Sequence, residues 1–331
     1  MLDHAPSEVP SSRPGDGSGL RADMPSRAVP VPPLRIGLLN NMPDAAFLQT
    51  ERQFRRLVGP QAMLSLFAFR DLPRAGLAAA HARAHYESHR ALPGAGLDAL
   101  VVTGCEPVAP HLEDEPFYAP LSAVVDWAAE NTVSTLFSCL ASHAAVLHRD
   151  GIRRRPRTAK LSGVYPCACT PHPLLAGLPD SVAVPHSRWN DLPEDELVAA
   201  GYTVLRRSDA IGVDLFVREA GSLLVFLQGH PEYDTASLAR EYRRDVFRFL
   251  DGQRATLPAL PENYFSDAAA ARLDAFARRA AAERRPDLFA AFPNLADTPL
   301  RPPAWPDDAD RLFRNWVAYV ARHRADSRAV R

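Results

Sequence analysis

Short apolar runs alternate with amphipathic stretches along the central part of the chain. Uninterrupted apolar runs are typical of strands buried on both faces, whereas apolar residues spaced by three and four positions are typical of helices. The runs predict strands at Leu34–Leu39, Met63–Phe69, Leu97–Thr103, Val133–Phe137 and Leu223–Leu227. The stretches between them predict helices at Ala46–Val58, Gly76–Arg90 and Leu121–Glu130. This order predicts an α/β fold with a mostly parallel sheet, helices on both faces, and ligands at the carboxyl ends of the strands.

The two ends of the chain follow different patterns. Residues 1–33 are rich in Pro, Ser, Gly and Arg, which predicts a disordered N-terminal tail before an α/β domain at 34–253. After a linker at Arg254–Pro261, helical patterns at Ala268–Arg285 and Asp308–Arg322 predict a helical C-terminal extension, 254–325, packed on that domain.

Composition narrows the classes of partner. The 331 residues are 47% hydrophobic with a net charge of −1, which predicts a sizeable core and gives no electrostatic reason for nucleic-acid or membrane binding. The four cysteines form no secreted disulfide framework, and Cys167-x-Cys169 lacks the second ligand pair of a metal site. No apolar stretch has transmembrane length and no signal-peptide core is present, so we expect a cytoplasmic protein with free thiols.

Two residues at predicted strand ends suggest the chemistry. Cys139 follows an apolar run and precedes a helical pattern, and a helix N-terminus favours a thiolate. His230 follows another apolar run, and Glu232 is placed to orient its imidazole. A lone cysteine at a strand end is usually a core residue, and His-Pro-Glu is often a helix start. Their combination nevertheless favours a covalent thiol enzyme.

Lys160 is the only lysine, although the chain has 38 basic residues. One explanation is that this lysine has been retained by chance. The other is that position 160 needs a compact ammonium rather than the planar fork of arginine.

These residues lie in blocks by which the chain resembles the homoserine O-succinyltransferase / O-acetyltransferase family over about residues 34–320. The family's fold is that of the class I glutamine amidotransferases, a flavodoxin-like arrangement. The blocks are Leu38-Leu-Asn-Asn-Met-Pro43, Thr50-Glu-Arg-Gln-Phe54, Val102-Thr-Gly104, Asp126-Trp127, Ser134-Thr-Leu-Phe-Ser-Cys139, Lys160-Leu-Ser-Gly-Val-Tyr165, Pro185-His-Ser-Arg188, Gly229-His-Pro-Glu-Tyr-Asp234, Glu241-Tyr-Arg-Arg-Asp245, Asn263-Tyr-Phe265 and Leu312-Phe-Arg-Asn-Trp316.

The resemblance implies a role for the residues at matching positions. It makes the α/β domain an acyltransferase catalytic domain that forms O-acyl-L-homoserine for methionine biosynthesis by ping-pong transfer. The implied roles are acyl-thioester nucleophile for Cys139, general base for His230, supporting carboxylate for Glu232, and substrate contacts for Lys160, Ser187 and Arg244. Candidates for the oxyanion hole are the backbone N–H groups of Leu140 and Cys105. Acyl-coenzyme A is expected as co-substrate, with no metal or redox cofactor, and the family resemblance suggests a homodimer.

The chain departs from the family pattern in three places. Gap-free counting puts the family's acyl-specificity position, glycine for succinyl and glutamate for acetyl, on Val108, although Glu106 is a candidate for the equivalent space. Asp44-Ala45 stands where many members have two lysines, which predicts that a cationic contact is missing or supplied elsewhere. His143 replaces a common glutamine, either as a substrate contact or as a structural residue.

Alternatives therefore stay open at this point. The donor is succinyl- or acetyl-coenzyme A, and the acceptor is homoserine, serine or another hydroxy amino acid. A glutamine amidotransferase-like hydrolase would use the same triad, but Ser138-Cys-Leu-Ala-Ser142 lacks the glycines that usually flank such a nucleophile. A non-catalytic relative would be expected to have lost one member of the triad.

Overall fold

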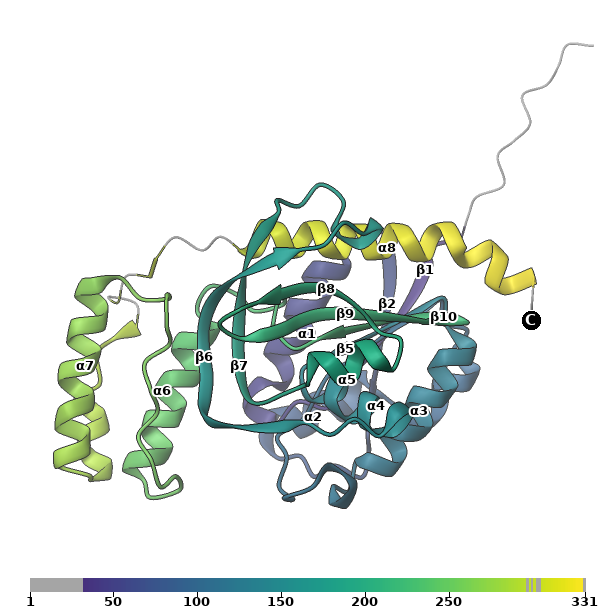
Figure 1. The fold of residues 1–331 in the computed structure, drawn as a ribbon. Helices are drawn as coiled ribbons and strands as arrows, with labels where there is room; N and C mark the ends of the chain where they lie inside the picture. The colour runs from purple at the N-terminus through teal and green to yellow at the C-terminus, as the bar shows by residue number, and fades with distance from the viewer. Residues whose placement is uncertain (1–31, 296–297, 299, 302–304, 330–331) are drawn as a thin grey trace, which may run out of the picture. The chain divides into compact units, whose positions relative to one another are not determined.

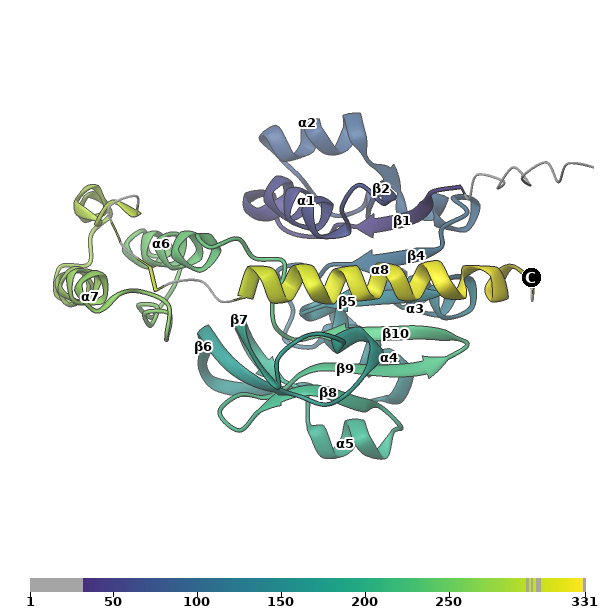
Figure 2. The ribbon, with the colours of Figure 1, turned by 90° about the horizontal axis from the view of Figure 1, so that it is seen from above.

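One mixed sheet organises the described part of the chain. The computed structural model describes residues 32–295, 298, 300–301 and 305–329. Ten strands lie in the order β3-β2-β1-β4-β5-β10-β9-β8-β6-β7 (Figures 1 and 2). The predicted disordered tail falls, up to residue 31, outside the described residues.

The first half of the sheet is parallel, and all of its strands except β3 correspond to predicted strands. Its strands are β1 (Leu34–Leu39), β2 (Ala62–Ala68), β3 (Glu87–Ser88), β4 (Ala99–Val102), β5 (Ser134–Ser138) and β10 (Ser222–Leu227). The helices between them are α1 (Asp44–Val58), α2 (Gly76–His85), α3 (Tyr118–Asn131) and α4 (Leu140–Asp150), with 3-10 turns at His89–Gly94 and Leu112–Asp114. The predicted helix at 76–90 ends earlier, because the two-residue strand β3 interrupts it.

The second half of the sheet is antiparallel and was not predicted. Its strands are β6 (Arg155–Cys169), β7 (Ser181–Asp191), β8 (Thr203–Ser208) and β9 (Gly212–Ala220), with the short helix α5 (Glu194–Ala199) and a 3-10 turn at Pro173–Leu175. Long β6 and β7 pair with each other at the edge of the sheet, as Figure 1 shows.

Both faces of the sheet are covered. Side chains alternate along a strand, and in β10 Leu223 and Val225 join a buried apolar cluster that includes Phe54 of α1. Leu224 and Phe226 point to the other face and join a cluster with residues of α3 and α4. The predicted fold class, a mostly parallel sheet with helices on both faces, is confirmed.

The C-terminal helices contact the elements that end at the candidate site. They are α6 (Ser237–Leu250), α7 (Asp267–Ala282) and α8 (Trp305–Ala329), with a 3-10 turn at Pro286–Ala291. The indole N–H of Trp305 donates to the carbonyl oxygen of Tyr233 at 2.9 Å, and that of Trp316 donates to Ser134 Oγ at 2.8 Å. Figure 2 shows α8 running along the sheet. Within the described residues, no helix is long and apolar enough to cross a membrane.

Candidate active site

Cys139 occupies a sharp turn between β5 and α4. Its backbone has φ 50° and ψ −111°, values that non-glycine residues rarely adopt. Its N–H donates to the carbonyl oxygen of Leu227 on the neighbouring strand β10 at 2.7 Å. A strained strand–turn–helix of this kind lifts a nucleophile above the sheet and places it at a helix N-terminus.

His230 and Glu232 follow the end of β10 and face the thiol. Glu232 Oε1 lies 2.8 Å from His230 Nδ1, which leaves Nε2 for the hydrogen bond with Cys139. Burial lowers the pKa of His230, but the charges of Glu232 and Cys139 and its hydrogen bonds to both raise it well above its ordinary value. The arrangement therefore favours the charged imidazolium form of His230 beside the sulfur of Cys139.

The candidate oxyanion donors lie where β4 leads into its following loop. A Cβ atom added to Gly104 would stand 2.7 Å from Leu140 Cβ and 3.1 Å from the Leu140 nitrogen, so glycine lets the two backbones approach. Cys105 follows directly, and burial raises the pKa of its thiol, which disfavours a second thiolate there.

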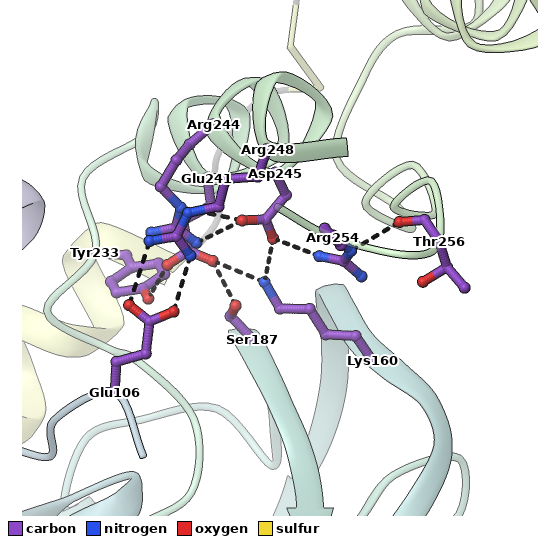
Figure 3. A network of polar contacts seen from close by, with 10 residues as sticks. All are labelled: Glu106, Lys160, Ser187, Tyr233, Glu241, Arg244, Asp245, Arg248, Arg254 and Thr256. Carbon is purple, nitrogen blue, oxygen red and sulfur yellow. Dashed lines mark hydrogen bonds and ion pairs between the residues drawn. The ribbon is translucent and has the colours of Figure 1, made fainter. Parts of the chain in front are cut away.

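Lys160, Ser187 and Arg244 meet in a polar network although they come from β6, β7 and α6 (Figure 3). Lys160 Nζ lies 3.4 Å from Glu241 and 3.1 Å from Asp245. Ser187 donates to Glu241, and Arg244 donates to Asp245 at 2.9 and 3.0 Å. These contacts give the sole lysine two carboxylate partners.

Glu241 is the centre of that network and was missed by sequence reasoning. It also accepts the Tyr233 hydroxyl. Burial raises the pKa of Glu241, but Lys160, Ser187 and Tyr233 more than offset this and the pKa is lowered, so it stays a carboxylate. Its spacing from Asp245 puts both acids on one face of α6, a signal that was readable in the Glu241-Tyr-Arg-Arg-Asp245 block.

These groups surround one cavity of about 170 Å³ at the carboxyl ends of the parallel strands. The predicted site residues that line it are Cys139, His230, Glu232, Lys160, Ser187, Arg244, Cys105 and Leu140. The structure thus brings together in one cavity the predicted catalytic, substrate-binding and oxyanion-hole residues, but not Val108 or His143.

A family model described as homoserine O-succinyltransferase matches residues 22–326. The chain belongs to the homoserine O-succinyltransferase family. A Methylorubrum extorquens protein named homoserine O-succinyltransferase is 61% identical over 325 residues, 97% of this chain and 98% of the relative. A Bradyrhizobium japonicum protein of the same name is 45% identical, and the alignment covers 87% of this chain and 90% of the relative.

A solved structure supports the fold independently. It comes from Thermoplasma acidophilum and is provisionally described as part of a GMP synthase, with a TM-score of 0.50 and 15% identity, covering 90% of this chain and 99% of that one. At that identity the likeness concerns the fold alone.

Val108, counted onto the family's acyl-specificity position, lies outside the cavity. Its side chain is 84% exposed, and its N–H donates to Glu115 at 2.6 Å, as does that of Ala109. Glu106, two residues earlier, lines the cavity and pairs with Arg248 on α6 at 2.8 Å (Figure 3).

The other two departures from the family pattern also have structural accounts. Arg74 donates to the carbonyl oxygen of Met42 at 2.8 Å and lies 3.6 Å from Asp44, so a cation braces the loop where many members have lysines. His143 is buried beside Gln228 Oε1 at 3.1 Å, outside the cavity. Burial, followed by the charge of Arg188, lowers the pKa of His143 to about 3, so it is a neutral structural residue.

One buried cluster has the residue types of a metal site. Ligand atoms of Cys167, His186 and Asp214 lie within 4.8 Å of one another. Asp214, however, already accepts from Arg206 at 2.6 Å and from the N–H of Gly229 at 3.0 Å. The guanidinium supplies the positive charge that a metal would bring, and Asp214 holds the backbone just before His230.

Proposed function

We propose that this protein transfers the succinyl group of succinyl-coenzyme A to the side-chain hydroxyl of homoserine, through a thioester on Cys139. Family membership supports acyl transfer to homoserine, and the names of the relatives above support succinyl as the acyl group. The observation that carries the mechanism is the hydrogen-bonded series Cys139, His230 and Glu232 at the wall of one cavity.

In the first half-reaction the Cys139 thiolate attacks the thioester carbonyl carbon. The carbonyl oxygen gains negative charge, which the N–H groups of Leu140 and Cys105 stabilise. When the intermediate collapses, the bond to the coenzyme A sulfur breaks and the His230 imidazolium protonates that sulfur. The products are free coenzyme A and a succinylated Cys139 beside a neutral imidazole.

In the second half-reaction the neutral His230 removes the proton from the homoserine hydroxyl. The oxygen attacks the acyl-enzyme carbonyl, and Cys139 leaves as a thiolate. O-succinylhomoserine departs and the imidazolium–thiolate pair is restored, with Glu232 stabilising the charged ring in the resting state.

The polar network would bind the acceptor. Among the hydrogen bonds of the described residues, Arg244 uses Nε and Nη2 for Asp245, which leaves Nη1 for the α-carboxylate of homoserine. Lys160 supplies a second positive charge, and Ser187 a hydroxyl, on the same cavity wall. Acyl-coenzyme A enters as a co-substrate, and the proposed steps use no metal or redox cofactor.

We also propose that the enzyme works in the cytoplasm, because a reducing compartment keeps cysteines as free thiols. All four cysteines are free, which agrees with such a setting. A homodimer is proposed from the family resemblance, to be tested by light scattering on the purified chain.

The test of the function combines mass spectrometry with product analysis. Wild-type protein mixed with succinyl-coenzyme A alone should gain one succinyl group, and homoserine should then discharge it. Acetyl-coenzyme A, serine and glutamine are tested in parallel. Release of ammonia from glutamine, without acyl transfer, would show that the protein is a glutamine hydrolase.

The control separates Cys139 from the other thiols. Cys139→Ala should gain no acyl group, whereas Cys169→Ala, which changes a partly exposed cysteine outside the cavity, should acylate normally. An adduct that persists in Cys139→Ala would contradict the mechanism.

A further inference from the structure

A second and larger cavity, of about 630 Å³, has no role in the steps above. It is lined by residues 110–114, Leu147, Arg153, Arg154, Pro156 and Asn190. Leu112, Leu147 and the two prolines give it an apolar wall. The two arginines carry positive charge, and Glu113 and Asp114 carry negative charge, with Glu113 paired to Arg153. This combination suits a long, partly apolar ligand that carries an anionic group.

The second cavity is built from the same segments as the catalytic cavity. Residues 103–106 line the catalytic cavity, and residues 110–114 of the same connection line the second one. Helix α4 contributes to both cavities, and so does strand β7. On β7, Trp189 lines the catalytic cavity and the adjacent residue Asn190 lines the second one. Residues 108 and 109, which lie between the two lining segments, donate their N–H groups to Glu115. The two cavities are therefore neighbours along these walls.

Arg154 is the distinctive charge in the second cavity. Arg153 is neutralised by Glu113 at 2.5 Å, whereas Arg154 makes no hydrogen bond or ion pair with any described residue. Burial lowers the pKa of the half-buried Arg154, whereas the charges of Glu115 and Cys139 raise it. A partly desolvated guanidinium without an ion pair is costly unless a ligand supplies the anion.

We infer that the second cavity receives the acyl-coenzyme A donor and that Arg154 binds an anionic group of it. The inference rests on the proposed function and adds the place where the donor sits. The anion has two sources in one molecule, the free carboxylate of the succinyl chain and the phosphates of the coenzyme. Arginine binds both through the same charged hydrogen bonds. Residues of the acceptor network do not line this cavity, so donor and acceptor would reach Cys139 from different sides.

The test measures the rate of Cys139 acylation in Arg154→Gln with four donors. Succinyl and acetyl groups are each presented on coenzyme A and on N-acetylcysteamine, which lacks the phosphates. Loss of one charged hydrogen bond should reduce kcat/KM by roughly tenfold to a hundredfold with any donor that carries the recognised anion. Acetyl-N-acetylcysteamine carries neither anion and should react at the wild-type rate.

The pattern of losses identifies the source of the anion. A loss with both succinyl donors indicates the carboxylate, and a loss with both coenzyme A donors indicates the phosphates. Arg154→Lys keeps the charge and should recover most of the activity. Arg155→Gln, an exposed neighbour paired with Glu196 outside the cavity, is the matched control and should be unchanged with all four donors.

Equal losses with all four donors, or no loss with any of them, would overturn the inference. Failure of the proposed function is distinguishable, because wild-type protein would then form no acyl adduct at all. Circular dichroism and thermal unfolding of each variant separate a binding effect from loss of the fold.

Discussion

Replacing Glu232 with glutamine tests the electrostatics of the catalytic pair. His230 and Glu232 are only 5% and 4% exposed, and the ring nitrogen lies 2.8 Å from the carboxylate. A hydrogen bond to a charged group contributes about 1.5–3 kcal/mol, which is roughly tenfold to a hundredfold in the imidazolium–thiolate population. We expect kcat/KM to fall by that factor while the amide keeps the ring oriented.

The pH profile gives a second, independent readout. The charge of Glu232 is among the causes that raise the pKa of His230. Without that charge the imidazolium loses its proton at lower pH, so the alkaline limb of kcat/KM should move to lower pH. The apparent pKa of this limb is a property of His230 and Glu232 as a coupled pair and not of either residue alone.

Coenzyme A release measured across the pH range provides the assay, and Glu51→Gln provides the control. Glu51 is likewise buried at 8% exposure and bonded to a histidine, His81, at 2.7 Å, but it does not line the cavity. This variant should lose some stability and keep the alkaline limb of the wild type. An unmoved limb together with an unchanged rate in Glu232→Gln would refute the reasoning.

Three further substitutions probe the cavity walls. Lys160→Arg puts a wider cation between two carboxylates, and steady-state kinetics should show a fall in kcat/KM of about tenfold to a hundredfold. An unchanged value would mean that the lysine has been retained by chance. Gly104→Ala forces a Cβ to 2.7 Å from Leu140 Cβ and should lower kcat far more than Gly94→Ala, whose Cβ meets nothing within 4 Å. Val108→Gly should leave the succinyl-to-acetyl preference unchanged because the side chain is 84% exposed; an altered preference would return Val108 to the site.

The parallel part of the sheet was readable from the sequence for a physical reason. Strands covered on both faces need apolar residues at every position, and these runs stand out. Strands β6 and β7 carry Arg155, Pro156, Pro166 and Pro185, and lie at or next to a sheet edge where proline and charge are tolerated. No apolar run marks them, and they were missed.

The residues of the candidate site also differ in how far the sequence alone revealed them. Cys139 and His230 end apolar strands and could be proposed from the residues themselves. Lys160 and Ser187 lie on the unpredicted strands. Lys160 stood out only as the sole lysine, and Ser187 was indicated by the family resemblance alone. Their shared partner Glu241 is brought to them by long-range packing of α6, which local pattern cannot reveal.

Gap-free counting put the acyl-specificity position on Val108, which the structure places outside the cavity; counting does not fix the register of a loop. Glu115 binds the N–H groups of two consecutive residues and turns the side chain of Val108 outwards. Glu106, two residues earlier, lies on the cavity wall.

The two tryptophan contacts of α8 have a consequence for synthesis on the ribosome. Trp316 bonds to Ser134 on the strand that ends at the nucleophile, and Trp305 bonds to Tyr233, next to Glu232. Translation delivers these indoles long after the catalytic residues themselves. A nascent chain, or a product truncated before α8, carries the whole catalytic set without its support. We therefore expect activity to appear only when synthesis is nearly finished, and a chain truncated before Trp305 to lose activity along with these two hydrogen bonds.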